Sequence, residues 1–393
     1  MRRIVVLLGG VIVLACALCA TAGARVPRGF VGTVIGPPLY TSDSPSVDLS
    51  GALRTMASSG VENLRFVANW SYAQPYPSWA EVPASQKSDF VDAGGVPTRF
   101  DRLDEIVAAA AQHRLSLLPT VLYAPGWDAA PVSDTSYPQP SSVIPYANFL
   151  TALIHRYGPD GTFWHTHSPR VPIRSWQIWN EPNLSVFWPQ QPFVSGYVAL
   201  LAAAHAAIKA ADPGARVVLA GMPNYSWRSL QQIYAVPGAA RLFDVVAVHP
   251  YTHDPAGVIT ILRKIRHVMD ASGDRRKPLI ADEVSWPSSL GQTPHNDGYD
   301  FATTQRGQAR NIAALLPMLA RDRHQLGLLG FDYYDWAGAE QRGGRVFDFA
   351  GLFRFTPSGL VAKPAFHAFR RAALAMEGCR RKGAVATVCR KHS

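Results

Sequence analysis

From residue 29 onward, short apolar runs alternate with longer segments in which apolar residues recur every three or four positions. The short runs predict strands, and the longer segments predict helices with one buried face. We expect strands at residues 29–35, 62–69, 115–123, 175–179, 216–220, 243–249, 278–283 and 327–333. We expect helices at residues 46–59, 100–113, 146–157, 192–211, 227–233, 256–269, 303–320 and 364–376.

Several of the strand runs are apolar at every position, as in Val217-Val218-Leu219 and Val245-Val246-Ala247-Val248. Such runs are typical of parallel strands that are covered on both faces. Eight strands that alternate with eight helices predict an α/β fold, a single (β/α)8 TIM barrel. An open, doubly wound sheet is the alternative, but it usually has fewer strands, and no glycine-rich phosphate loop follows the first strand.

The two ends of the chain differ from this pattern. Met1-Arg2-Arg3 precedes an uncharged apolar stretch that ends in Ala22-Gly23-Ala24, which predicts a secretory signal peptide over residues 1–24. An uncleaved membrane anchor is the alternative, because the stretch is long enough to cross a bilayer. We therefore expect a secreted or cell-surface protein with the catalytic barrel at 25–376 and a basic tail at 377–393.

The net charge of +10 owes much to the C-terminal residues, among which Glu377 is the one acidic side chain against several arginines and lysines. Such a tail could associate electrostatically with an anionic cell wall, or it could be an ordinary solvated tail. Nucleic-acid binding is not predicted, because aromatic residues are not interleaved with the basic ones on a repeated module.

Four cysteines are present, and two of them, Cys16 and Cys19, would leave with the signal peptide. The remaining pair, Cys379 and Cys389, predicts a local disulfide in the tail of an exported protein. No metal or cofactor is expected. His165 and His167 form the one pair at ligand spacing, and no further ligands stand near them in the sequence.

Polar and aromatic residues gather at the predicted carboxyl ends of the strands, where barrel enzymes carry their reactive groups. Two of these residues, Glu181 and Glu283, are carboxylic acids that end the fourth and seventh strands. Glycoside hydrolysis uses two such groups, one to protonate the leaving oxygen and one to attack the anomeric carbon or activate water. The spacing of three strands would let the two acids face each other across the barrel mouth.

The motifs around these acids resemble those of clan A glycoside hydrolases. Trp179-Asn180-Glu181-Pro182-Asn183 is similar to the clan's acid/base motif, and Ile280-Ala281-Asp282-Glu283 is similar to its nucleophile strand. The resemblance covers roughly residues 29–376. It implies a retaining β-glycoside hydrolase that acts on oligo- or polysaccharide, with Glu181 as acid/base and Glu283 as nucleophile.

The resemblance also implies roles for five substrate-binding residues. These are Arg65 as the partner that holds Glu283 ionised, Asn180 at the sugar 2-hydroxyl, His249 beside the acid/base, Tyr251 at the nucleophile, and Trp336 as the platform of the −1 sugar. Because side chains alternate along a strand, we expect Asp282 to point away from Glu283 and to be structural.

The family within the clan is open between two choices. Asn183-Leu184 followed by Phe187-Trp188 is similar to family 39, whereas His249-Pro250-Tyr251 is equally similar to the cellulase-like family 5. The chain has Tyr123 where family 5 often has a histidine. It has Asp282-Glu283-Val284-Ser285-Trp286 where family 39 more often has Thr-Glu-Phe, so the sugar is not defined.

Two other functions remain open. A transglycosylase of the same clan would use the same residues, and a non-catalytic glycan-binding barrel on the cell surface would use the same fold. We expect a monomer with a carbohydrate substrate. The segment at 71–99 is rich in Pro, Ser and aromatic residues, and we expect it to shape the substrate side.

Overall fold

The computed structural model describes residues 26–37, 39, 48–132, 137–293, 299–341, 343–376, 380–382 and 385–388. The predicted signal peptide, Cys379 and Cys389 lie outside the described residues, and the predictions about them stay predictions.

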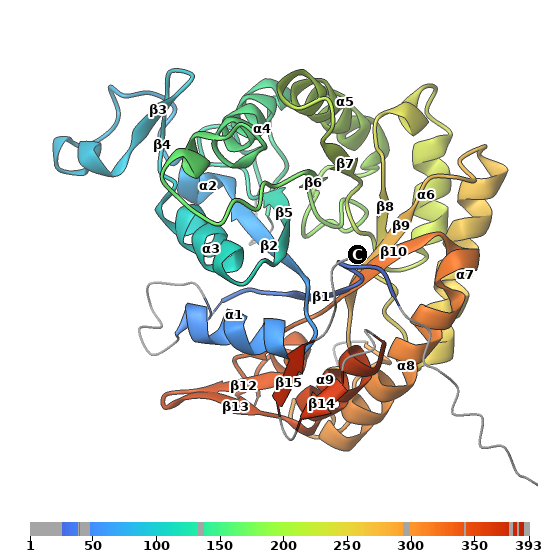
Figure 1. Ribbon diagram of the computed structural model, residues 1–393. Coiled ribbons are helices and arrows are strands. Elements are labelled where there is room, and N and C mark those ends of the chain that lie inside the picture. The colour runs from blue at the N-terminus through green and yellow to red at the C-terminus, as the bar shows by residue number, and fades with distance from the viewer. Residues whose placement is uncertain are drawn as a thin grey trace, which may run out of the picture.

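Eight parallel strands form the central sheet, which closes into a barrel (Figure 1). The strands are β1 (Val31–Val34), β2 (Asn63–Asn69), β5 (Ser116–Leu122), β6 (Ser175–Ile178), β7 (Arg216–Val218), β8 (Val246–Val248), β9 (Leu279–Val284) and β10 (Leu328–Tyr333). They are hydrogen-bonded in the order β7-β6-β5-β2-β1-β10-β9-β8. A parallel bridge between Val218 and Val245 joins the two ends of that order, which confirms the predicted (β/α)8 barrel.

A helix follows each barrel strand, and together these helices form the outer ring (Figure 1). They are α1 (Leu49–Ser58), α3 (Asp101–Gln112), α4 (Val143–Tyr157), α5 (Val194–Ala211), α6 (Ser226–Tyr234), α7 (Pro255–Ala271), α8 (Gln305–Leu326) and α9 (Pro364–Met376). Side-chain caps begin several of them, for example Asp254 on α7 and Thr304 on α8. Helix α8 runs six residues further than the predicted 320, because its end is set by Gly327 in the left-handed conformation.

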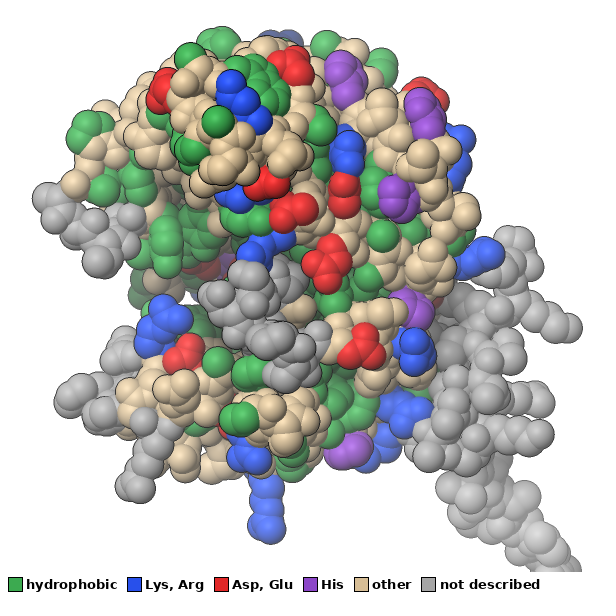
Figure 2. All heavy atoms as spheres, turned by 90° about the vertical axis from the view of Figure 1, so that its left-hand side faces the viewer, with side chains coloured by type: hydrophobic (Ala, Val, Ile, Leu, Met, Phe, Trp, Pro, Cys, Tyr) green, Lys and Arg blue, Asp and Glu red, His purple; other side chains and the backbone are tan. Residues whose placement is uncertain are grey.

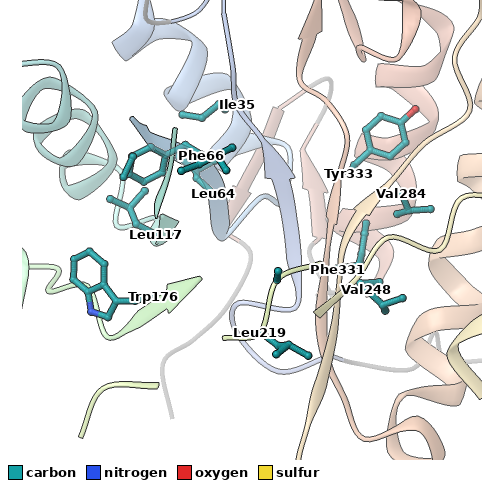
Figure 3. Close-up of a cluster of buried hydrophobic side chains, with 14 of the residues drawn as sticks. Ile35, Leu64, Phe66, Leu117, Trp176, Leu219, Val248, Val284, Phe331 and Tyr333 are labelled. Carbon is teal, nitrogen blue, oxygen red and sulfur yellow. The ribbon is translucent and has the colours of Figure 1, made fainter. Parts of the chain in front are cut away.

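The core lies between the barrel and the helices and continues into the barrel interior. Figure 3 shows part of it, with Ile35, Leu64, Phe66, Leu117 and Trp176 on one side and Leu219, Val248, Val284, Phe331 and Tyr333 on the other. Burying a Leu, Val or Phe side chain contributes about 1.5–3 kcal/mol relative to leaving it exposed. This packing holds the strand ends in place and therefore positions the side chains that follow them.

Several small elements were not predicted. The segment between β2 and α3 contains α2 (Trp70–Ala73), the 3-10 helix η1 (Ala84–Asp89) and a hairpin of β3 (Val91–Ala93) and β4 (Val96–Thr98). Gly94 and Gly95 both have positive φ at the hairpin turn, which is typical of a two-residue turn between twisted strands. The hairpin projects away from the barrel (Figure 1).

The other elements that were not predicted lie after β10, except for the two short 3-10 helices η2 (Thr162–His165) and η3 (Ala239–Arg241), which lie earlier in the chain. A three-stranded sheet of β11 (Ala337–Gly338), β12 (Phe353–Thr356) and β13 (Gly359–Ala362) precedes α9, and β14 (Arg380–Lys382) pairs with β15 (Val385–Val388) after it. A further 3-10 helix, η4 (Val346–Phe349), lies between β11 and β12. The predicted tail at 377–393 thus contains a short hairpin.

Within the described residues, α5 is the one helix that is long and apolar enough to cross a bilayer. It buries Tyr197, Leu200, Leu201, Ala204 and Ile208 in the protein, so packing in the barrel accounts for its apolar composition. Figure 2 shows one face of the molecule, on which acidic and basic side chains are interspersed.

Candidate active site

The two predicted acids meet at the carboxyl ends of the strands. Glu181 lies three residues beyond the end of β6, and Glu283 is the fifth residue of β9. A carboxylate oxygen of each, together with a ring nitrogen of His249, lie within 4.8 Å of one another. Both acids are largely buried, with 9% and 8% of their surface exposed. The structure therefore brings together two carboxyl groups that are distant in the sequence.

Glu283 is held by two donors. Arg65 Nη1 donates to its Oε1 at 2.5 Å, and Tyr251 Oη donates to its Oε2 at 2.8 Å. Both carboxylate oxygens thus accept a hydrogen bond on the side of the group that faces the protein. These contacts fix the orientation of the carboxylate.

Arg65 connects the two acids through a buried network. Its Nη2 donates to Asn180 Oδ1 at 2.8 Å, and its Nε donates to Gln177 Oε1 at 2.7 Å. Burial alone would lower the pKa of Arg65, but the charges of Glu283 and Asp282 raise it above its usual value. Arg65 is therefore a permanent positive charge at the base of the site.

Gln177 was not predicted as a site residue. It lies in β6, accepts from Arg65 and from Thr120 Oγ1, and donates from Nε2 to Asp282 Oδ2 at 2.6 Å. It lies between the buried residues Trp176 and Ile178 and four positions before Glu181, and this even spacing from Glu181 was a signal that it points into the barrel.

Asp282 does not point away from Glu283, and that expectation was wrong. Its Oδ2 lies 3.1 Å from Arg65 Nε, and Arg65 also contacts Glu283. The pairing of β9 with β10 is irregular between Ala281 and Val284, where β9 has one extra residue. Such a bulge interrupts the alternation of side chains, so two consecutive acids reach the same interior network.

Glu181 is paired with His249, whose Nδ1 lies 2.6 Å from its Oε1. Burial raises the pKa of Glu181, while the contact with His249 acts in the opposite direction and the charge of Glu283 adds to the increase. The backbone of Glu181 is left-handed, with φ of 42°, as is that of Trp179 at 67° and of Tyr123 at 68°. Non-glycine residues of this kind cluster at functional sites, where the surrounding structure holds them.

His249 is completely enclosed among acids. Burial alone would lower the pKa of His249, but Glu283 and Asp282 raise it to about 10. Gly221 makes room for the ring, because a Cβ at that position would lie 2.0 Å from His249 Nε2. The close approach of residues 221 and 249 therefore requires glycine.

The same three groups, Glu181, His249 and Glu283, are close enough to hold a metal ion by geometry alone. A histidine must be neutral to bind a metal, whereas the pKa of His249 of about 10 keeps it protonated at neutral pH. Arg65 adds a second positive charge beside Glu283. The donor set suits proton transfer and nucleophilic attack better than it suits a cation.

Trp336 does not lie where the −1 platform was expected. Its side chain is fully buried, with its ring centroid 5.0 Å from that of Phe353 and 5.8 Å from that of Phe366, behind the strand ends. No face of the ring is open to a sugar. Tyr334, which was not among the predicted site residues, interacts electrostatically with both Glu283 and Glu181.

A comparison with family models found no match for this sequence, and a comparison with curated proteins found none either. Solved structures do match its fold. A glucosidase from Croceicoccus marinus has a TM-score of 0.63 and 16% identity, covering 90% of this chain and 68% of that one. A family 39 glycoside hydrolase from Bacteroides cellulosilyticus has a TM-score of 0.59 and 17% identity over 88% of this chain, which spans 63% of that protein's length.

A family 5 mannosidase from Rhizomucor miehei has a TM-score of 0.53 and 15% identity, covering 91% of this chain and 96% of that one. The predicted resemblance to families 39 and 5 of clan A is therefore confirmed in the fold. Identities in this range establish a shared fold and leave the activity to be argued from the site itself.

Proposed function

We propose that the protein is a retaining β-glycoside hydrolase that cleaves oligo- or polysaccharide by double displacement. The observation that carries the proposal is the pair Glu181 and Glu283, because one carboxylate oxygen of each lies within 4.8 Å of the other. Retaining enzymes place their two carboxyl groups about 5–5.5 Å apart, whereas inverting enzymes need about 6.5–9.5 Å to admit a water.

In this mechanism Glu283 attacks the anomeric carbon while Glu181 donates its proton to the leaving oxygen. Arg65 and Tyr251 orient Glu283, and burial raises the pKa of Glu181, which favours the protonated form that the first step needs. Formation of the glycosyl ester removes the negative charge of Glu283, which is one cause of that raised pKa. Glu181 then becomes a stronger acid, and its carboxylate can take a proton from the water that releases the sugar.

A cavity beside Tyr123 supports a substrate that is longer than one sugar. Asn69, Ser71, Tyr123 and Tyr137 line a space of about 330 Å³ next to the acids. Tyr123 interacts with Glu283, and its ring lies 4.8 Å from that of Tyr137. Aromatic faces beside hydroxyl and amide groups suit a sugar ring, so we assign a further sugar subsite to this cavity.

The subsite is tested with Tyr137→Ala, whose native side chain is 42% exposed. We expect kcat/KM on an oligosaccharide to fall at least tenfold and kcat/KM on an aryl monosaccharide to change by less than twofold. Equal losses on the two substrates would assign Tyr137 to general structure instead of to a subsite.

The catalytic assignment is tested on an activated aryl β-glycoside. Glu283→Ala should lose turnover, and azide should restore it with a glycosyl azide of inverted configuration. Glu181→Ala should keep the first step on the good leaving group and, with azide, give a product of retained configuration. Inverted product from Glu181→Ala would exchange the two roles, and full turnover by both variants would contradict the proposal.

The same assay separates the two alternative functions. A transglycosylase would pass the sugar to an added saccharide in preference to water, and a non-catalytic barrel would bind glycans without turnover. We further propose, from the N-terminal pattern of residues 1–24, that the protein is exported. Recovery of the tagged protein only from the cytosol would contradict export.

A further inference from the structure

A cavity of about 250 Å³ opens at the end of the barrel opposite the acids. Its wall contains the first residues of four barrel strands, namely Asn63, Ser116, Ser175 and Arg216. The acids stand at the other ends of the strands, as Ser175 and Glu181 on either side of β6 illustrate. The cavity is therefore separate from the catalytic site.

Three arginines line this basal cavity, and its lining contains no acidic side chain. They are Arg28 before β1, Arg174 before β6 and Arg216 at the start of β7. The floor is apolar, since it is formed by Leu118, Val218, Val245 and Ile280 from the lowest layer inside the barrel. Two serine hydroxyls and an amide add neutral polar groups to the wall.

Each of the three guanidinium groups in the cavity wall has N–H donors that are not used by other residues and could bind a ligand. Arg28 Nη2 donates to the backbone oxygen of Arg114 at 3.0 Å, which leaves its charge uncompensated. Arg174 Nη2 lies 3.1 Å from Asp212 Oδ1, yet 51% of the Arg174 side chain stays exposed. The side chain of Arg216 makes no hydrogen bond or ion pair with any residue in the described ranges.

The acids near the cavity are already engaged or neutral. Asp212 also accepts from Gly214 N, and Glu62 accepts from Gly29 N at 2.6 Å. Asp332, which Asn63 contacts from the cavity wall, is fully buried, and burial raises the pKa of Asp332 to about 8. The barrel interior thus adds little negative charge behind the arginines at neutral pH.

The surrounding loops at this end add positive charge. Further arginines lie in the turns that lead into the strands, and these are Arg114, Arg170, Arg275 and Arg276. The same loops contain Asp244 and Asp274, each of which is paired with a lysine. An excess of positive charge around a low-dielectric hollow attracts anions and concentrates them there.

We propose that this basal cavity binds a phosphate group that carries a small organic substituent. Arginine forks match the oxygens of a phosphate and form charge-assisted hydrogen bonds with them. The apolar floor would cover the organic part, and about 250 Å³ equals the share of roughly eight liquid water molecules. The phosphate could belong to a free metabolite or to an anionic polymer, and the proposal does not depend on the glycosidase activity.

The test is calorimetric titration of the full-length protein with glycerol 3-phosphate, inorganic phosphate, poly(glycerol phosphate) and glucuronate, at low salt. Arg216→Gln should weaken binding at least tenfold. Arg276→Gln is the matched control, because it removes the same charge from the same end of the barrel outside the cavity, and it should weaken binding less than twofold. Unchanged melting temperatures and aryl-glycosidase activity in both variants would show that the fold is intact, and Arg28→Gln repeats the test should Arg216→Gln fail to fold.

Preference for glycerol 3-phosphate over the polymer would point to a free metabolite, and the reverse order would point to the polymer. Equal losses of affinity in Arg216→Gln and Arg276→Gln would show that binding depends on the overall positive charge of this end of the barrel and not on the cavity, and would overturn the proposal. Absence of binding by the wild-type protein, or tighter binding of glucuronate than of glycerol 3-phosphate, would overturn it as well.

Discussion

Replacement of His249 by glutamine should change how the stability of the protein depends on pH. The imidazole is 1% exposed, and its two nitrogens lie 2.6 Å from Glu181, 3.5 Å from Asp282 and 3.6 Å from Glu283. Glutamine keeps a polar side chain of similar length but cannot carry the positive charge. The substitution therefore isolates the contribution of that charge.

The magnitude follows from the pKa of His249, which rises from 6.5 to about 10 on folding. A raised pKa stabilises the folded state when the group is protonated, so the contribution is full below about pH 6.5 and is lost as the pH approaches 10. At about 1.36 kcal/mol per pKa unit, the contribution is about 4 kcal/mol at pH 7 and falls below about 1 kcal/mol at pH 10. Coulomb's law gives a similar scale, about 5 kcal/mol for one charge pair at 3.5 Å and a dielectric constant near 20.

The assay is urea unfolding of the wild-type and His249→Gln proteins at pH 6, 7, 8, 9 and 10. Other groups that titrate near pH 10 contribute equally to both proteins, so the difference in the free energy of unfolding reports His249. We expect a difference of about 3–5 kcal/mol at pH 7, as for the loss of one partner of a buried ion pair, and a decline toward pH 10. A difference that stays constant across this range would refute the reasoning, because it would show that packing and not charge sets the effect.

Three further outcomes follow from the site. Tyr251→Phe removes the hydrogen bond to Glu283, which is worth about 1.5–3 kcal/mol. The substitution should lower kcat about 10- to 100-fold with little change in the melting temperature, and an unchanged kcat would show that Tyr251 has no role in catalysis. Trp336→Ala should cost about 3–5 kcal/mol of stability in urea unfolding while KM stays the same, and a raised KM would restore Trp336 to the substrate site. Asp282→Asn removes a negative charge that contacts Arg65 and His249, and the remaining positive charge of these two groups should lower the pKa of Glu181. The alkaline limb of the profile of kcat/KM against pH should then move to lower pH, and movement to higher pH would contradict this.

The order of the barrel elements could be predicted from the sequence because burial on both faces leaves continuous apolar runs. Each of the eight strands and eight ring helices was found near its predicted range. The hairpin of β3 and β4 and the sheet that contains β11 escaped prediction, since strands of two to four residues carry no measurable periodicity. The end of α8 was missed because its last turns, from Arg321 to Leu326, read as polar and the stop is set by Gly327.

The candidate site was predictable where strand order alone places a side chain, as for Arg65, Glu181 and Glu283. The site could not be predicted where the local backbone geometry decides in which direction a side chain points. The extra residue in β9 directs Asp282 inward, and the turn after β10 leaves Tyr334 beside the acids while it buries Trp336. Neither a bulge nor such a turn has a periodic signal in the sequence.

The charges of the buried site agree with the proposed role of Glu181 as the acid. Arg65 and His249 supply two positive charges, and Asp282 and Glu283 supply two negative ones, so the group is balanced when Glu181 is neutral. Ionisation of Glu181 in the free protein would leave an extra negative charge in a low-dielectric site. In the proposed mechanism, esterification of Glu283 removes one negative charge, and loss of the proton from Glu181 restores neutrality. The charge of Asp282 is part of that balance, because without it the site would be positive when Glu181 is neutral.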